Sequence, residues 1–253
     1  MLHLKSDSEI EKIRDAGRIA AEAMLRVKEI VQVGCTTDEL DAVAAQYINN
    51  QGAIASALNY RGYPKSICVS INNEIVHGIP GPRKLLSGDI ISVDIAVNKN
   101  GFHGDMNATM LVGQVEEEVQ RLVETTRTCL ELGLAESTSD KRLGDIGHSI
   151  QSHAEKYGYS VVREYCGHGI GREFHEEPQL LHYGSANTGR RLQIGMVFTI
   201  EPMINAGCKE TRLLDDRWTA VTADGSLSAQ FEHTVAVTSK GPDVLTRFED
   251  LPF

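Results

Sequence analysis

Apolar residues recur at spacings of three and four positions in four segments of this chain. This period is typical of helices that bury one face against a core. In the second segment we expect Thr37 to be the N-cap and Gly52 to stop the helix. The third segment begins with three glutamates, which suit the positive end of a helix dipole. We therefore predict helices over residues 8–31, 37–52, 116–132 and 142–157.

Shorter runs of apolar and β-branched residues alternate with turn residues through the rest of the chain, and they predict β-strands. No low-complexity stretch and no Pro/Ser-rich linker divides the sequence. The pattern predicts an α+β fold, in which helices cover one face of a largely antiparallel sheet. The predicted strands cover residues 66–71, 90–97, 102–112, 160–165, 196–203, 209–214, 217–223 and 230–238.

Two segments in different halves of the chain resemble each other. LLSGDIISVD and LQIGMVFTIE align on Gly88 and Gly195, and each then reaches an acidic residue six positions later, Asp94 and Glu201. A His-Gly-Ile tripeptide precedes each segment. This internal repeat predicts a duplicated unit within a single domain. We place that domain over residues 1–253, with pseudo-symmetric halves of about 1–120 and 121–253.

The second and third predicted strands form one hairpin, and each carries an aspartate, Asp94 and Asp105. A turn of four residues would place these two opposite each other, whereas a type I′ turn centred on Asn100–Gly101 would place Asp94 opposite Asn107. Both registers put the aspartates on one sheet face, together with His103, because strand side chains alternate. Neighbouring carboxylates repel each other unless a cation lies between them. A solvated sheet face is the alternative interpretation.

Three polar residues of the second half have a similar setting. Glu201 follows the apolar run GMVFTI, Glu232 lies in AQFEHTVAV, and His168 is flanked by glycines in CGHGIG. An ionised carboxylate in a semi-buried strand is costly unless it is paired or coordinated. A lone histidine in such a setting is more often a hydrogen-bonded loop residue than a ligand. Together with Asp94 and Asp105, these residues form an oxygen-rich set with one imidazole, which suits a pair of Mn, Fe(II), Co or Zn ions.

The composition narrows the class of protein. The 253 residues carry a net charge of −10, which argues against a nucleic-acid binder that relies on phosphate attraction. No apolar run reaches the length of a membrane span, and the N-terminal residues lack the apolar core of a secretory signal. The five cysteines are scattered and odd in number, which favours reduced thiols. We expect a soluble cytoplasmic protein.

Four motifs, DIAVNKNGFHGD, CGHGIGREFHEEP, FTIEP and FEHT, resemble those of type I methionine aminopeptidases in order and spacing. The resemblance covers roughly residues 8–237. It implies the pita-bread fold, a pseudo-twofold duplicated antiparallel sheet covered by helices on one face. The short interval between Glu201 and Glu232 and the lack of a long N-terminal extension imply the short bacterial type.

The same resemblance implies two divalent metal ions, which are Co, Mn, Fe(II) or Zn. Asp105 and Glu232 match the bridging ligands, and Glu201 is both a ligand and the proton shuttle. His77 matches a residue beside the scissile amide, and His175 matches one that polarises the substrate carbonyl. The implied metal ligands are Asp94, Asp105, His168, Glu201 and Glu232.

The implied substrate site is an aromatic-lined pocket for methionine. Ala57 stands where some relatives carry a cysteine, which leaves the depth of the pocket open. His77 and His175 belong to the implied substrate-binding set as well as to the catalytic one. The other members are Tyr60, Tyr63, Cys68, Phe174 and Trp218.

The implied reaction is the removal of N-terminal methionine from peptides and nascent proteins, with a small second residue preferred. The resemblance implies a cytoplasmic monomer, and the ribosome is a further candidate partner. A proline-specific pita-bread aminopeptidase is the alternative enzyme. A pita-bread protein that only binds a partner is the alternative from another class, but such proteins lose metal ligands, and all five implied ligands are present.

Overall fold

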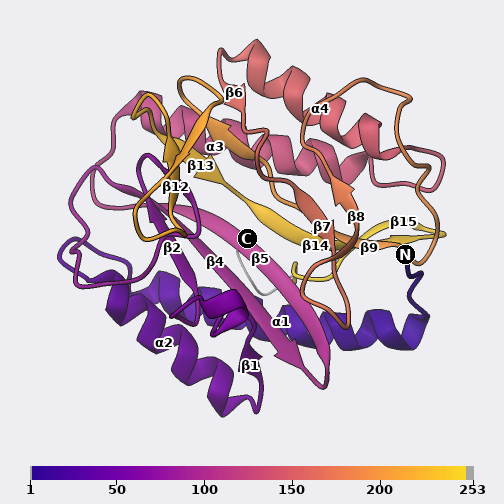
Figure 1. Cartoon of the computed structure of the whole chain (residues 1–253), viewed down its shortest axis with the longest axis horizontal. Coiled ribbons are helices and arrows are strands. Elements are labelled where there is room, and N and C mark those ends of the chain that lie inside the picture. Colours follow the sequence, from indigo (N-terminus) through magenta and orange to yellow (C-terminus); the bar gives the residue numbers. More distant parts are fainter. Residues whose placement is uncertain (1, 249–253) are drawn as a thin grey trace.

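The computed structural model describes residues 2–248. All four predicted helices are present, each within three residues of its predicted ends (Figure 1). They are α1 (Asp7–Ile30), α2 (Thr37–Asn50), α3 (Glu117–Ala135) and α4 (Leu143–Lys156). The strands are β1 (Ile54–Ala55), β2 (Cys68–Ile71), β3 (Glu74–Val76), β4 (Ile90–Lys99), β5 (Phe102–Leu111), β6 (Ser160–Val161), β7 (Gly167–Gly169), β8 (Glu176–Leu180), β9 (Val197–Ile200), β10 (Met203–Asn205), β11 (Thr211–Leu213), β12 (Ala220–Thr222), β13 (Ser228–Gln230), β14 (Glu232–Thr238) and β15 (Gly241–Val244).

A nine-stranded sheet joins strands from both halves of the chain. Its order is β1-β4-β5-β14-β9-β7-β8, with β2 paired to β4 and β15 paired to β14. Its pairings are antiparallel, as predicted, and the two halves meet where β5 pairs with β14. Two three-stranded sheets, β13-β10-β6 and β11-β12-β3, complete the described strands.

The helices pack against one face of the main sheet. In the projection of Figure 1, α1 and α2 lie at the bottom and α3 and α4 at the top, and strands of the sheet run between the two pairs. Val93 and Ile95 of β4 belong to the core under α1 and α2, whereas Phe198 and Val235 belong to the core under α3 and α4. Because strand side chains alternate, the neighbours of these residues project from the opposite face. That opposite face carries Asp94 and Asp105, the polar side chains of the hairpin.

The cap of α2 corrects one prediction. Thr36, not Thr37, is the N-cap: its hydroxyl accepts the Glu39 N–H at 3.3 Å, and the Glu39 carboxylate accepts the Thr36 N–H at 2.7 Å. Both residues are threonines, so residue type alone did not distinguish them. Thr37 is instead buried, and its hydroxyl donates to the Gly81 carbonyl at 3.0 Å. Gly52 follows the helix end with a φ of 60°, as expected of a C-terminal stop.

The internal repeat corresponds to a repeated local conformation. Gly88 and Gly195 have φ values of 99° and 89°, and a strand begins two residues after each. A side chain is strongly disfavoured in this backbone region, which explains glycine at both positions. Five strands lie wholly outside the predicted ranges, namely β1, β3, β7, β8 and β15, and two more, β10 and β13, overlap them at one residue each. They have two to five residues each, too few for a period of two to emerge.

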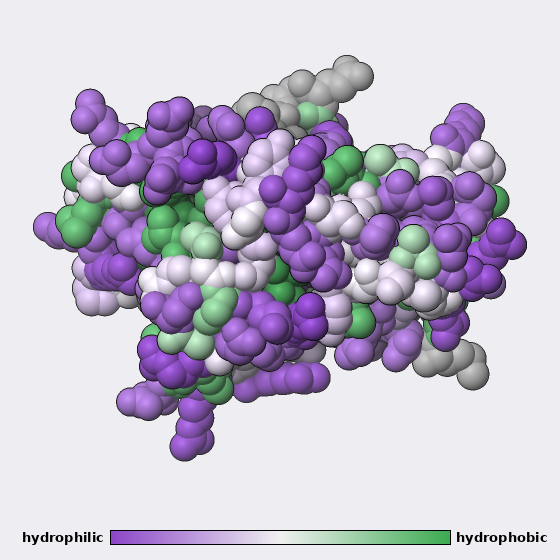
Figure 2. Space-filling view, turned by 90° about the horizontal axis from the view of Figure 1, so that it is seen from above, coloured by the Kyte–Doolittle hydropathy of each residue, from purple (hydrophilic) through white to green (hydrophobic). Residues whose placement is uncertain are grey.

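Hydrophilic residues dominate the face seen in Figure 2, where hydrophobic residues form small groups among them. Within residues 2–248, no helix has the length and apolar character needed to cross a membrane.

Candidate active site

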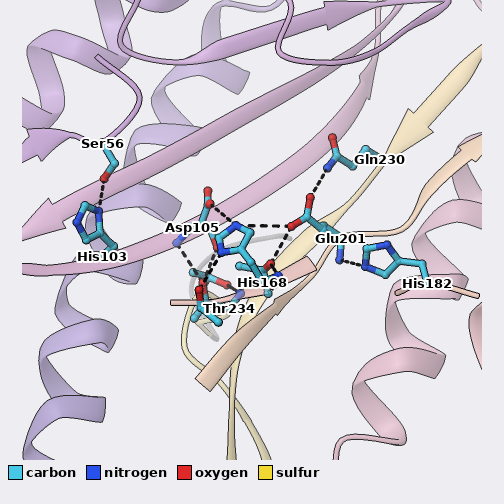
Figure 3. Close-up of polar contacts among 11 residues, drawn as sticks. Ser56, His103, Asp105, His168, His182, Glu201, Gln230 and Thr234 are labelled. Carbon is cyan, nitrogen blue, oxygen red and sulfur yellow. Dashed lines mark hydrogen bonds and ion pairs between the residues drawn. The ribbon is translucent and has the colours of Figure 1, made fainter. Parts of the chain in front are cut away.

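The five implied metal ligands converge on one cavity, although they come from five separate strands or strand ends. Asp94 projects from β4, Asp105 from β5, His168 from β7 and Glu232 from the start of β14, whereas Glu201 directly follows β9. All five line a cavity of about 930 Å³. Figure 3 shows Asp105, His168 and Glu201 pointing toward one another. The sheet therefore gathers residues that lie up to 138 positions apart (94 to 232) in the sequence.

The ring of His168 has one nitrogen free for a cation. Its Nδ1 lies 3.0 Å from the carbonyl oxygen of Gly169, so Nδ1 carries the proton and donates it. Nε2 then holds a lone pair, and it lies 3.8 Å from Asp105 Oδ2 and 3.7 Å from Glu201 Oε1. These oxygens are also electron-rich, so the three atoms suit a cation placed among them.

The four carboxylates lie close together, with Asp105 and Glu232 buried and Asp94 and Glu201 half-buried, and this setting raises their pKa values. Burial raises the pKa of Asp94 to about 7 and that of Glu201 to about 8. Burial and the neighbouring carboxylates raise the pKa values of Asp105 and Glu232 well above their usual range. Like charges that cannot separate disfavour ionisation in this way. A divalent cation would reverse the effect by stabilising the ionised forms.

Unsatisfied oxygen atoms show that this donor set fits a metal ion. Asp105 Oδ1 and Glu232 Oε1 are buried without a hydrogen-bond partner. Asp105, His168 and Glu232 each offer a ligand atom, and these atoms lie within 4.8 Å of one another. Buried polar atoms without partners are rare and costly in native proteins. Carboxylate and imidazole ligands without thiolates are those that Mn, Fe(II), Co and Zn accept.

Neighbouring side chains fix the orientation of Glu201. The Thr199 hydroxyl donates to Glu201 Oε1 at 2.8 Å, and its oxygen accepts the His168 N–H at 3.0 Å. Gln230 Nε2 donates to Glu201 Oε2 at 3.3 Å (Figure 3). His182 Nε2 accepts the Glu201 N–H at 3.0 Å. Such contacts commonly set the orientation and basicity of a ligand.

Further hydrogen bonds hold Asp105 and Asn107, the residue opposite Asp94. Thr234 Oγ1 accepts the Asp105 N–H at 3.1 Å and donates to the Asp105 carbonyl at 2.8 Å. Asn107 Nδ2 donates to Gln230 Oε1 at 3.0 Å. Thr199, His182 and Gln230 lie outside the set of site residues that the sequence motifs imply. Thr199 and Gln230 each lie two positions before a ligand, which is the period of a strand and a signal that could have found them, whereas no local signal pointed to His182.

The implied substrate residues line the same cavity as the ligands. Tyr63 and Trp218 make an edge contact with centroids 5.1 Å apart, and Tyr60 makes one with Phe174 at 5.0 Å. Cys68 of β2 is the pairing partner of Asp94 of β4 on the neighbouring strand. The other residues that line the cavity include Ala57, His77 and His175.

The two catalytic histidine candidates differ in backbone conformation and in neighbours. His77 has a φ of 60°, a strained value that is uncommon for a non-glycine residue and concentrates at functional sites. Burial lowers its pKa to about 4. The ring of His175 stacks on Tyr60 at 5.1 Å and lies 4.2 Å from the ring of His168. Burial, together with the nearby His168, lowers the pKa of His175 to about 3, so both histidines present neutral imidazoles to the cavity.

His103, which the sequence placed on the aspartate face without a role, supports Phe174. Asn98 Oδ1 accepts the Gly101 N–H at 3.2 Å, so its Nδ2 donates to His103 Nε2 at 2.8 Å. His103 therefore carries its proton on Nδ1, which donates a hydrogen bond to Ser56 Oγ at 2.8 Å (Figure 3). The fixed ring stacks on Phe174 with an interplanar angle of 6°.

Comparison with known proteins identifies the family. The model of metallopeptidase family M24 matches residues 11–239. The chain belongs to metallopeptidase family M24. This M24 member is 52% identical over 244 residues to methionine aminopeptidase A of Synechocystis sp., covering 96% of both chains. It is 48% identical to methionine aminopeptidase 1 of Bacillus subtilis, covering 98% of this chain and 100% of the relative.

A solved structure agrees with these relatives. The crystal structure of methionine aminopeptidase from Rickettsia prowazekii superimposes with a TM-score of 0.96 at 44% identity, covering 98% of this chain and 100% of that one. The pita-bread fold implied by the sequence motifs is thereby confirmed, and so is the similarity to methionine aminopeptidases.

Proposed function

We propose that this M24 metallopeptidase removes the N-terminal methionine from peptides and nascent proteins, preferring a small second residue. The observation that carries the proposal is the convergence of five potential ligands and an aromatic pocket on one cavity. Enzymes named methionine aminopeptidase that share about half of its residues over nearly the whole chain support it.

We further propose that the site binds two divalent metal ions, and that Asp105 and Glu232 are among the residues that would hold them. The unpartnered oxygens of these two carboxylates support this assignment. Asp94, His168 and Glu201 are the remaining proposed ligands. When bound, such ions act as Lewis acids and lower the pKa of water at the site, which supplies the nucleophile for peptide hydrolysis.

Three side chains of the protein carry out the remaining chemistry. Glu201 takes a proton from the attacking water and delivers it to the leaving nitrogen. The Thr199 hydroxyl, which donates to Glu201 Oε1, keeps the carboxylate in its orientation. His175 is an exposed residue that lines the cavity, and its imidazole N–H donates to the substrate carbonyl oxygen as negative charge develops there. His77, on its strained backbone, faces the scissile amide.

The aromatic residues provide the methionine specificity. Tyr60, Tyr63, Phe174 and Trp218 form an apolar wall beside the proposed ligands, and Cys68 contributes a soft, polarisable surface. A flexible thioether packs well against aromatic rings. We propose a single catalytic domain over residues 1–253, acting as a cytoplasmic monomer on free N-termini and on chains that emerge from the ribosome.

Peptide cleavage with controlled metal content tests the proposal. Protein purified without added metal is assayed for bound metal, then for release of the first residue from Met-Ala-Ser, Met-Leu-Ser, Pro-Ala-Ser and Leu-Ala-Ser after each metal is restored. We expect metal-dependent release of methionine from Met-Ala-Ser, slower release from Met-Leu-Ser and none from the other two. Metal-independent release, or a preference for the Pro-initiated peptide, would contradict the proposal.

A further inference from the structure

A buried ion pair links the segment before α1 to the loop that carries Phe174 and His175. Lys5 Nζ lies 2.5 Å from Glu176 Oε2, and the two side chains are 1% and 14% exposed. Lysine is almost never buried unless it is paired. The backbone of Lys5 is itself fixed, because its N–H donates to the Gly195 carbonyl at 2.7 Å. The charge of Lys5 is therefore held at one point beside the cavity.

The partner of Lys5 closes a tight turn. The other oxygen of Glu176, Oε1, accepts the N–H of Glu173 at 3.1 Å. Phe174 and His175 are the two residues enclosed by this contact. One carboxylate therefore binds Lys5 on one side and the backbone of the loop on the other, so the orientation of the turn depends on the position of Lys5.

Gly171 shows that the path of Lys5 is built into the loop. A Cβ atom at Gly171 would lie 2.4 Å from Lys5 Cε, so the alkyl chain of Lys5 crosses the loop where only glycine leaves room. The carbonyl of Gly171 also accepts the N–H of His103 at 2.8 Å, and the ring of His103 stacks on Phe174. The loop is therefore fixed from β5 and from the N-terminal segment.

We propose that Lys5 and Glu176 are positioning residues that hold His175 and Phe174 in their working orientation. The inference rests on the proposed function, because it assigns His175 to the substrate carbonyl and Phe174 to the methionine pocket. The alternative is a pair that only stabilises the fold. A buried pair can often be replaced by neutral residues without loss of stability, so the two roles are separable by experiment.

Four variants and one control separate positioning from stability. Lys5→Met and Glu176→Gln each leave one buried charge without a partner, whereas the double variant leaves none and keeps similar side-chain volumes. Lys141→Met is the matched control, since Lys141 forms a comparable 2.7 Å pair with Glu136 on the surface. Gly171→Ala displaces Lys5 without removing a charge, and its effect should not add to that of Lys5→Met.

Two readouts are needed, and one of them does not depend on activity. The first is kcat and KM with Met-Ala-Ser for protein of measured metal content. The second is the rate of chymotrypsin cleavage after Phe174, followed by mass spectrometry, which reports how often the loop opens. An inactive wild-type chain would count against the proposed function, and the cleavage comparison would still test the pair.

We expect the double variant to recover the unfolding temperature of the wild type but not its activity. Its kcat should fall by about 10- to 100-fold, as small misplacements of catalytic groups do, with a smaller change in KM and unchanged metal content. Cleavage after Phe174 should be about tenfold faster. A double variant, or Gly171→Ala, with wild-type kcat and wild-type cleavage would overturn the proposal.

Discussion

Asn107 lies directly opposite Asp94 in the β4–β5 hairpin. Asp105 lies two residues before Asn107 on the same strand, opposite Ala96. The turn sets this register: Asn100 and Gly101 have φ values of 53° and 78°, as a type I′ turn requires. An amide rather than a second carboxylate therefore faces Asp94. The two aspartates share a sheet face without the direct opposition that destabilises like charges.

Replacing that amide by a carboxylate should destabilise the metal-free protein. Asn107 is 3% exposed, and Asn107→Asp removes the donor to Gln230 while adding a buried acid. We expect a loss of about 1–3 kcal/mol in the free energy of unfolding, measured by chemical denaturation in EDTA. The exposed Asn49→Asp is the control and should stay within about 0.5 kcal/mol of the wild type. Equal stabilities for the two variants would contradict the prediction.

Metal removal should have a larger effect at higher pH. Burial raises the pKa values of Asp94 to about 7 and of Glu201 to about 8, so the metal-free folded state binds more protons than the unfolded chain between about pH 4 and pH 8. The stability of the metal-free protein is therefore lost as the pH rises through this interval. The raised pKa of Asp94 alone corresponds to a loss of roughly 4 kcal/mol in the free energy of unfolding of the metal-free protein over this pH interval.

Thermal unfolding with and without EDTA measures this effect. A bound cation stabilises the ionised carboxylates, so the metal-loaded protein should keep its stability as the pH rises. Between pH 5 and pH 8 the difference in Tm should widen by about 10 °C. A difference that is constant with pH would show that the carboxylates do not bind the added ion.

Alternation along single strands made much of this site predictable. The shared face of Asp94 and Asp105 follows from strand geometry alone, and the three- and four-residue spacing located all four helices. The register of the hairpin stayed open because both turns fit its sequence. Only the conformation of Asn100 distinguishes them.

Contacts between distant segments were not predictable in this way. His182 reaches the backbone of Glu201 across 19 residues, and Lys5 reaches Glu176 across 171. Neither spacing has a local period or motif. The strand β7 was missed for a related reason, since its glycines have no intrinsic strand preference and pair only because β8 and β9 flank them.

Glu201→Gln should abolish turnover while leaving the fold intact. The neutral amide can still accept from the Thr199 hydroxyl at one oxygen, but it cannot take a proton from water. Loss of a general base lowers kcat by about 10²- to 10⁴-fold. Turnover of Met-Ala-Ser and the circular dichroism spectrum test the two halves of this prediction. The exposed Glu124→Gln serves as the control, and near-normal activity of Glu201→Gln would remove Glu201 from its proposed role.

The contact between α1 and β5 predicts a purely steric effect. A Cβ atom at Gly104 would lie 2.5 Å from the backbone nitrogen of Gly17, so the helix approaches the strand at a pair of glycines. Gly104→Ala should force the two elements apart and cost about 1–3 kcal/mol. In a chain of this size that corresponds to a fall in Tm of about 2–10 °C.

Gly81→Ala is the matched control for that substitution. No atom lies within 4 Å of a Cβ atom at Gly81, and neither Gly81 nor Gly104 has a positive φ, so the Cβ atom meets a steric clash only at Gly104. Because Gly104 immediately precedes Asp105, its displacement should also weaken metal binding, whereas Gly81→Ala should leave both Tm and metal affinity unchanged. Equal Tm values for the two variants would show that α1 can move away from β5 without cost.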